Sequence, residues 1–160
     1  VKFTIKENYI KKNNKYIELI KNNNSVSIAI RQHRYSERAK KNETKSTEFT
    51  KKTINYISKA VSFFKNKISN PKFFIWSNDF ADLNNYFNEN EFTFIENDNN
   101  KSINDFNLFK YSKHFIVGPS SFHWWGAWLN QNPDKICARP SGDLNSSNNR
   151  DFWPESWISI

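Results

Sequence analysis

The chain of 160 residues alternates short apolar runs with longer amphipathic stretches. An apolar residue every three or four positions predicts a helix over residues 47–68, which the pair Asn70-Pro71 would end. Shorter helices are predicted within residues 3–24, over residues 80–87, from residue 102, and after the turn at residues 118–121. The apolar runs predict strands over residues 25–30, 72–77, 91–95, 114–117 and 135–138. Residues 97–100 predict a turn, and the residues after 138 are predicted to be a loop with aromatic anchors.

Strands that alternate with helices predict an α/β fold whose parallel sheet is covered by helices on both faces. In such sheets, ligands bind beyond the carboxyl ends of the strands. The polar residues that follow the predicted strands are therefore the first candidates for a binding site, and they are Arg31, Ser77, Asn78, Asp79, Ser120 and Ser121.

Composition narrows the classes of protein. Aromatic residues make up 17% of the chain, which argues against disorder, and no apolar run approaches the eighteen residues of a membrane span. The formal net charge is +8, but the lysines are scattered and the arginines dispersed, which favours a compositional bias over a nucleic-acid interface. The single Cys137 excludes an internal disulfide and fits a reducing compartment, so we expect a cytoplasmic protein. Because the chain starts at Val1 and contains no Met, we expect a fragment of a longer protein.

The segment from Gly118 to Leu129 contains several candidate binding groups. A small-residue turn between a strand and a helix exposes backbone N–H groups, and the helix dipole adds partial positive charge. Ser120 and Ser121 could donate hydroxyls to an anion there, or could form an ordinary N-cap. Trp124 and Trp128 share one helix face, which is typical of core packing, and Gly126 and Ala127 would allow a close neighbour.

Three further side chains each have two interpretations. Asp79 could accept hydrogen bonds from a guanine edge or a ribose hydroxyl, or could cap the helix that follows it. His123 could be a base or a packed, hydrogen-bonded histidine. Asp105 is assigned mainly to a capping box with Ser102, at the start of a helix predicted to bury Ile103, Phe106 and Phe109. His33 and Arg34 could supplement a phosphate site near Arg31 or be solvated.

These residues resemble glycosyltransferase family 11, the alpha-1,2-fucosyltransferases. The family signature Asn-Ser-Ser-Phe-Ser-Trp-Trp-Gly-Ala-Trp-Leu is matched by residues 119–129, with Pro119 and His123 as departures. Residues 74–79 are similar to the Phe-Ser-Asp-Asp turn of the family and keep Ser77 and Asp79. The first-strand motif His-x-Arg-Arg-x-Asp keeps only its first arginine, because Ala29, Gln32 and Arg34 replace the other three residues.

The resemblance implies a Rossmann-like three-layer domain over residues 25–160, equivalent to the C-terminal, donor-binding half of a GT-B glycosyltransferase. Residues 1–24 would be a polar lead-in, and the N-terminal acceptor domain would lie outside this chain. The implied activity is inverting transfer of fucose from GDP-fucose to an acceptor oligosaccharide, without a required metal or other cofactor. Arg31 would be the catalytic group on the diphosphate, and the substrate-binding residues would be Arg31, Ser77, Asp79, Ser120, Ser121, Phe122, His123 and Trp124.

Two other functions stay open at this point. The altered first motif favours a degenerate or non-fucose member that binds a nucleotide sugar or glycan. The basic charge allows a binder of single-stranded nucleic acid, whose affinity would fall steeply with salt. Turnover of GDP-fucose by the full-length protein would exclude the first of these alternatives.

Overall fold

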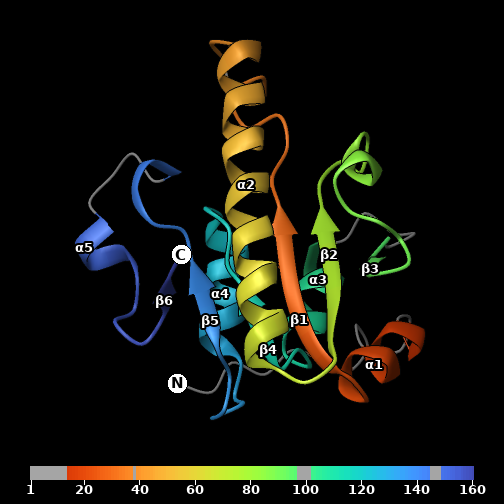
Figure 1. Ribbon diagram of the computed structural model, residues 1–160. Coiled ribbons are helices and arrows are strands. Elements are labelled where there is room, and N and C mark those ends of the chain that lie inside the picture. The colour runs from red at the N-terminus through yellow and green to blue at the C-terminus, as the bar shows by residue number, and fades with distance from the viewer. Residues whose placement is uncertain (1–13, 38, 97–101, 145–148) are drawn as a thin grey trace.

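The computed structural model describes residues 14–37, 39–96, 102–144 and 149–160, and its centre is a parallel β-sheet (Figure 1). The sheet has six strands in the order β3-β2-β1-β4-β5-β6, and every neighbouring pair is parallel. This confirms the predicted α/β class and its Rossmann-like layers. The strands are β1 (Asn24–Ile30), β2 (Pro71–Ser77), β3 (Phe92–Phe94), β4 (His114–Ile116), β5 (Cys137–Arg139) and β6 (Ile158–Ser159).

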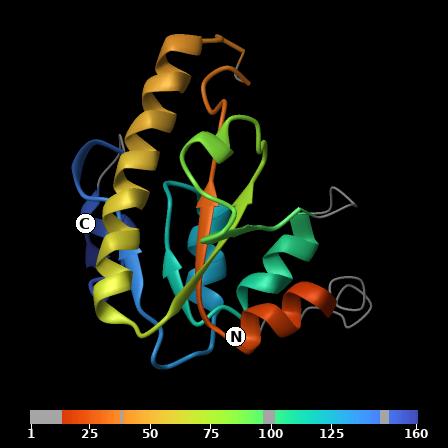
Figure 2. The ribbon, with the colours of Figure 1, turned by 45° about the vertical axis from the view of Figure 1, so that its right-hand side comes forward.

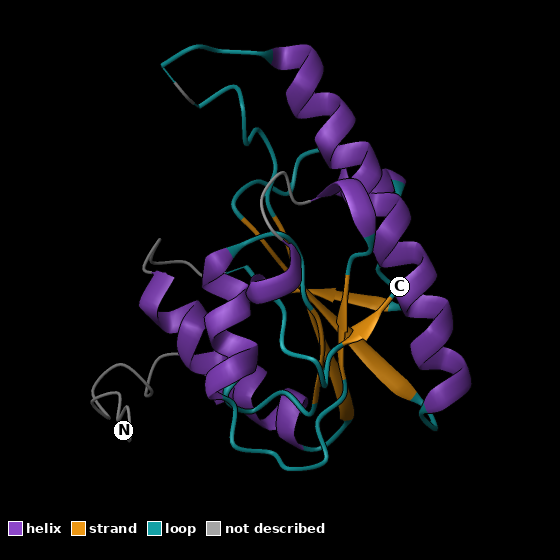
Figure 3. Ribbon diagram, turned by 90° about the vertical axis from the view of Figure 1, so that its left-hand side faces the viewer, coloured by secondary structure: helices purple, strands orange, loops and turns teal. Residues whose placement is uncertain are grey.

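Helices cover both faces of the sheet. Figure 3 shows the sheet between one long helix, α2, and a group of shorter helices on the other side. In Figure 2 the helices α1 and α3 lie beside each other, on the side of the sheet away from α2. The helices are α1 (Asn14–Lys21), α2 (Glu43–Lys67), α3 (Ser102–Phe109), α4 (Ser121–Leu129) and α5 (Asn149–Phe152). Across the described residues, no helix is long and apolar enough to cross a membrane.

Helix α2 begins four residues before the predicted start. Asn42 adopts extended backbone and its side chain accepts a hydrogen bond from the Lys45 N–H at 2.8 Å, which is an N-cap. Glu43 follows in the first turn, where its charge is favourable to the helix dipole. The extra turn is polar, so hydrophobic spacing alone does not reveal it, and the capping residue sets the boundary.

The alternation of β1 divides its side chains between two cores. Val26, Ile28 and Ile30 are buried against α2, together with the apolar face of that helix. On the opposite face, the small side chains of Ser25, Ser27 and Ala29 leave room for the aromatic residues of the second core. That second core lies beneath α1, α3 and α4 and includes Phe74, Trp76, Phe109, Phe115 and Trp153.

Three predictions about local structure were wrong. Residues 80–87 form only a short 3-10 turn, Leu83–Asn85, after Asp82 at φ 62°. Helix α3 buries Asn104, Asn107, Leu108 and Phe109, and Ile103 is 38% exposed, so the buried face is rotated from the predicted one. The closing residues were predicted as a loop but include α5 and β6. The turn predicted at residues 97–100 lies outside the described residues, as does the part of the lead-in before residue 14.

Helices α3 and α4 pack closely because a glycine faces an aromatic ring. A Cβ placed on Gly126 would lie 2.4 Å from Cδ2 of Phe109. The expectation of a close neighbour at this position is confirmed. On the other side of α4, the rings of Trp124 and Trp128 stack at a centroid distance of 5.4 Å and an interplanar angle of 16°.

Candidate functional site

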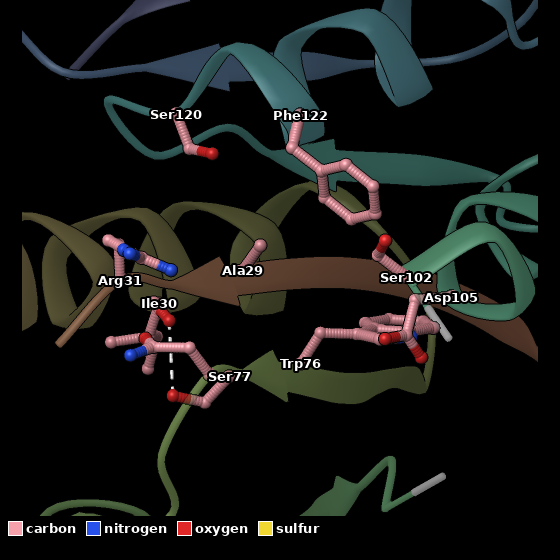
Figure 4. A pocket seen from close by; sticks show the side chains of 10 residues that line it. Ala29, Ile30, Arg31, Trp76, Ser77, Ser102, Asp105, Ser120 and Phe122 are labelled. Atoms are coloured by element: carbon pink, nitrogen blue, oxygen red, sulfur yellow. Dashed lines mark hydrogen bonds between the residues drawn. The ribbon is translucent and has the colours of Figure 1, made fainter. Parts of the chain in front are cut away.

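A cavity of about 330 Å³ lies at the carboxyl ends of β1 and β2, beside the first turns of α3 and α4 (Figure 4). This is the edge at which open α/β sheets bind ligands. The cavity brings together five of the residues predicted for the site, namely Arg31, Ser77, Asn78, Ser120 and Phe122. Its lining also includes Ala29, Ile30, Trp76, Ser102 and Asp105.

Arg31 lies at the mouth of this cavity and also lines a second cavity of about 430 Å³. Its guanidinium forms an ion pair with the Glu37 carboxylate, and the two side chains are 45% and 46% exposed. Exposed ion pairs of this kind contribute roughly 0–1 kcal/mol, so an anion with more than one charge can replace Glu37 at little cost. Arg31 thus lies where an anion is predicted to bind.

Polar side chains join the ends of β1 and β2 into one unit. The Asn78 side chain accepts a hydrogen bond from the Gln32 N–H at 2.8 Å, and Gln32 Nε2 donates to the carbonyl of Asp79 at 2.8 Å. Ser77 Oγ lies 3.1 Å from the Ile30 carbonyl, to which it can donate. Gln32, which replaces an arginine of the family motif, therefore serves to position this edge of the sheet.

Asp79 lies beside the cavity and does not appear in its described lining. Its Oδ1 accepts a hydrogen bond from the Ala81 N–H at 2.9 Å, and Oδ2 lies 2.9 Å from His33 Nε2. The Ala81 N–H, and after it His33, lower the pKa of the Asp79 carboxyl. The local turn thus engages both carboxylate oxygens, and the predicted contact with a guanine edge or ribose stays a prediction.

The turn between β4 and α4 is fixed by contacts from three elements. The buried Tyr56 hydroxyl of α2 donates to the Val117 carbonyl at 3.1 Å. A Cβ on Gly118 would lie 2.8 Å from the backbone oxygen of Ala29, so this position leaves no room for a side chain. Arg34 Nη1 donates to the Pro119 carbonyl. The start of α4 is therefore held at a defined place above β1.

Ser120 is the N-cap residue of α4, with extended backbone at φ −134° and ψ 123°. Its hydroxyl makes no capping hydrogen bond within the described part of the chain. The structure therefore does not show the ordinary side-chain cap that was the alternative for Ser120. The residue lines both cavities. Ser121 begins the helix and lines the second cavity, and Phe122 lies on the wall of the first (Figure 4).

His123 and Trp124 point away from this edge. His123 is fully buried, with Nε2 3.0 Å from Ser27 Oγ and its ring 4.9 Å from that of Phe109. Trp124 Nε1 donates to the Phe152 carbonyl at 3.0 Å. Neither residue belongs to the described lining of either cavity. The structure gives both residues packing contacts, and the substrate contacts that the resemblance implies for them stay a prediction.

The burial of His123 predicts a dependence of stability on pH. Burial lowers the pKa of its imidazole from 6.5 to about 3 in the folded chain. Between these values the unfolded chain binds a proton that the folded chain does not, so acid lowers the free energy of unfolding by up to about 1.4 kcal/mol per pH unit. We expect urea unfolding at pH 7 and pH 5 to show this loss, and His123→Gln to reduce it.

The exposed His33 provides the matched control, since its side chain is 49% exposed. His33→Gln should keep the loss of stability between pH 7 and pH 5. Equal losses in the wild-type chain and in His123→Gln would contradict the prediction.

Asp105 and Trp76 are among the cavity residues that the sequence does not identify as site residues. The sequence predicts a capping box for Asp105 and a buried strand for Trp76. Helix α3 follows β3, so its first turn lies at the carboxyl edge of the sheet, where Ser102 and Asp105 face the cavity (Figure 4). The signal that could have found Asp105 is this rule of topology, because in parallel α/β folds the helix after each strand starts at the ligand-binding edge.

The fold and the cavity define a class of protein: a parallel α/β domain with an arginine and a helix N-terminus at its ligand-binding edge. The family model "Glycosyl transferase family 11" matches residues 2–160, and the chain belongs to this family. Within the described residues, no group of three His, Cys, Asp or Glu side chains is placed to hold a metal ion.

Two curated relatives come from Escherichia coli. An alpha-1,2-colitosyltransferase is 32% identical over 153 residues, which are 89% of this chain and 50% of the relative. The O-antigen biosynthesis glycosyltransferase WbnK is 26% identical over 109 residues, which are 67% of this chain and 36% of that protein. The chain thus spans about half the length of the first relative and a smaller share of the second. No solved structure matches it.

Proposed function

We propose that this chain is the donor-binding half of a glycosyltransferase that moves a deoxy sugar from a GDP-sugar to a hydroxyl of an acceptor oligosaccharide. The observation that carries the proposal is the cavity in which Arg31, Ser120 and Asp105 meet at the carboxyl edge of the sheet. Membership of the family supports the reaction class. Because the matched regions cover only 50% and 36% of the two curated relatives, we propose that the acceptor is bound by a second, N-terminal domain, as in a GT-B enzyme.

The reaction requires stabilisation of a leaving diphosphate. When the acceptor hydroxyl attacks C1 of the sugar, the bond from C1 to the diphosphate oxygen breaks and its electron pair stays on the diphosphate. The hydroxyl proton passes to a base that we do not assign to this chain. Arg31 and the N-terminal end of α4, at Ser120 and Ser121, would meet the growing negative charge. Preorganised donors of this kind typically contribute roughly 3–4 kcal/mol each, and we propose that they act here without a metal.

The other end of the first cavity suits a nucleobase. Phe122 of α4 and Trp76 of β2 lie on opposite sides of Ala29, and Asp105 lies beside Trp76 (Figure 4). A flat base can stack on aromatic rings, and the N1–H and 2-amino groups of guanine can both donate to one carboxylate. We therefore place the guanine at Asp105.

The Asp105 assignment predicts a change in nucleotide preference. The wild-type chain should bind GDP more tightly than inosine diphosphate, which lacks the 2-amino group, by at least about tenfold, the effect of one charge-assisted hydrogen bond of roughly 1.5–3 kcal/mol. Asp105→Asn should weaken GDP binding and reduce this difference, because an amide presents one acceptor and one donor. Isothermal titration calorimetry with the two nucleotides measures both effects.

Asp134→Asn is the matched control, because Asp134 is exposed and lines neither of the two cavities at this edge. It should leave both affinities unchanged. An Asp105→Asn chain that keeps the wild-type preference for GDP would exclude Asp105 as the guanine-binding residue.

The transferred sugar has two candidates. Fucose is implied by the resemblance of the sequence, and the name of the 32% identical relative favours colitose, which is fucose without its 3-hydroxyl group. Turnover of GDP-fucose and of GDP-colitose by the full-length protein, compared at equal concentrations, separates them. Turnover of neither, together with retained GDP binding, would identify a degenerate nucleotide-sugar-binding member.

A further inference from the structure

We propose that Arg34 is a second anion-binding residue of this site and holds the donor diphosphate together with Arg31. The inference rests on the proposed function, since it assumes that a nucleoside-diphosphate sugar binds at this edge. Its starting point is the second cavity of about 430 Å³, which adjoins the first through their shared residues Arg31 and Ser120. The second cavity is polar, and its described lining is Arg31, Arg34, Glu37, Pro119, Ser120 and Ser121.

The Arg34 side chain is held in place before any ligand arrives. Its Nη1 donates to the carbonyl of Pro119, the residue before Ser120. Its guanidinium carbon lies 5.0 Å from the centroid of the Phe49 ring of α2, at the distance of a cation–π contact. A side chain that is already ordered loses little conformational entropy when it binds an anion, so these contacts favour a binding role.

The loop that carries Arg34 is itself tied to α2. The buried Ser46 Oγ accepts hydrogen bonds from the N–H groups of Tyr35 at 2.8 Å and Ser36 at 3.0 Å. The Tyr35 carbonyl in turn accepts a hydrogen bond from the Asn42 N–H at 3.1 Å. The position of Arg34 relative to the start of α4 therefore follows from the hydrogen bonds of Gln32 before it and of Tyr35 and Ser36 after it.

The two arginines of the cavity differ in the charge that surrounds them. Arg31 is paired with Glu37, whereas no carboxylate in the described ranges pairs with Arg34. A guanidinium has five N–H donors, and the described residues supply Arg34 with one acceptor, the Pro119 carbonyl. Arg34 is thus the uncompensated cation of the cavity, with donors remaining for phosphate oxygens.

The chemistry of the cavity favours a diphosphate over an anion with a single charge. Two planar guanidinium groups can each hold phosphate oxygens in a bidentate manner, and two serine hydroxyls lie in the same lining. One guanidinium would be matched by one carboxylate, as Glu37 already shows at Arg31. A ligand that engages both arginines needs negative charge spread over two adjacent groups, which a diphosphate provides.

The test measures binding of inorganic pyrophosphate, GDP and guanosine to the 160-residue chain by calorimetry. We expect Arg34→Ala to weaken pyrophosphate and GDP at least tenfold and to change guanosine binding less than twofold, since guanosine has no phosphate. Arg34→Lys keeps the charge but lacks the planar fork, so its affinity for pyrophosphate should fall by at least threefold. If Arg34→Ala does not fold, the pyrophosphate affinity of Arg34→Lys tests the proposal by itself.

Lys41→Ala is the matched control, because it removes one positive charge from an exposed position in the same loop. An equal loss of pyrophosphate binding in Lys41→Ala would overturn the proposal in favour of general electrostatic attraction. So would wild-type pyrophosphate binding by Arg34→Ala, or a guanosine loss as large as the GDP loss, which would indicate a purely structural role.

The result also separates this inference from the proposed function. If Arg31→Ala loses GDP binding and Arg34→Ala does not, the donor site stands and only the role assigned to Arg34 is wrong. If the wild-type chain binds neither GDP nor pyrophosphate, the proposed donor site is wrong and the role of Arg34 fails with it.

Discussion

Arg31→Ala should weaken GDP binding by at least tenfold, which corresponds to about 1.4 kcal/mol. Arg31 lines both cavities, so it stands where the nucleoside end and the phosphate end of a donor would join. A charge-assisted hydrogen bond contributes about 1.5–3 kcal/mol, and removal of the guanidinium would lose at least one. Calorimetric titration of the variant with GDP measures the effect.

Glu37 gives this experiment its internal reference. Since Glu37 occupies the guanidinium of Arg31 in the absence of ligand, Glu37→Gln should bind GDP as tightly as the wild-type chain or severalfold more tightly. A protein in which Arg31 only pairs with Glu37 would show no change in GDP affinity in either variant. That pattern would contradict the placement of the diphosphate.

Phe109→Ala should lower the free energy of unfolding by about 3–5 kcal/mol. Phe109 is fully buried, and its ring centroid lies 4.9 Å from that of Trp76 and 5.5 Å from that of Phe122. Both of these residues line the first cavity, so the wall of the nucleobase end rests on Phe109. Denaturant unfolding should show the loss, and GDP affinity should fall as well.

Two further variants serve as controls for Phe109→Ala. Phe109→Leu keeps much of the volume and should lose less stability than Phe109→Ala. Tyr86→Ala truncates an aromatic side chain that is 52% exposed, and it should stay within about 0.5 kcal/mol of the wild-type chain. A Phe109→Ala chain as stable as Tyr86→Ala would show that the second core does not depend on this ring.

The sheet could be predicted from the sequence because its signals are local. The apolar runs that became β1, β2 and β4 are short, continuous and bounded by polar residues, and buried parallel strands produce this pattern. The rotated face of α3 could not be predicted in the same way. Ile103 and Phe106 have the right spacing for a core, but the buried position went to Leu108, because the neighbouring helix α4 decides which side of α3 is covered.

In the candidate site, too, some residues could be predicted from local sequence signals and others depend on the packing of neighbouring elements. Arg31, Ser77 and Ser120 follow strands, and the general rule for parallel sheets was enough to bring them together. His123 lies in the same motif as Ser120, but Ser120 is the N-cap residue with extended backbone, whereas His123 lies inside α4 and is buried against Ser27 of the sheet. Asp105 comes from another helix, and only the three-dimensional arrangement places it at the cavity.

The tightly held turn at residues 117–120 also bears on how this sequence can change over time. Lysine and asparagine are abundant at exposed positions, where most substitutions alter stability by less than about 0.5 kcal/mol. At Gly118 even a methyl group would meet the backbone oxygen of Ala29, which no rotamer change can move aside. A drift in base composition can therefore change many exposed residues with little effect on stability. The turn that presents Ser120, in contrast, permits almost no alternative residue at Gly118.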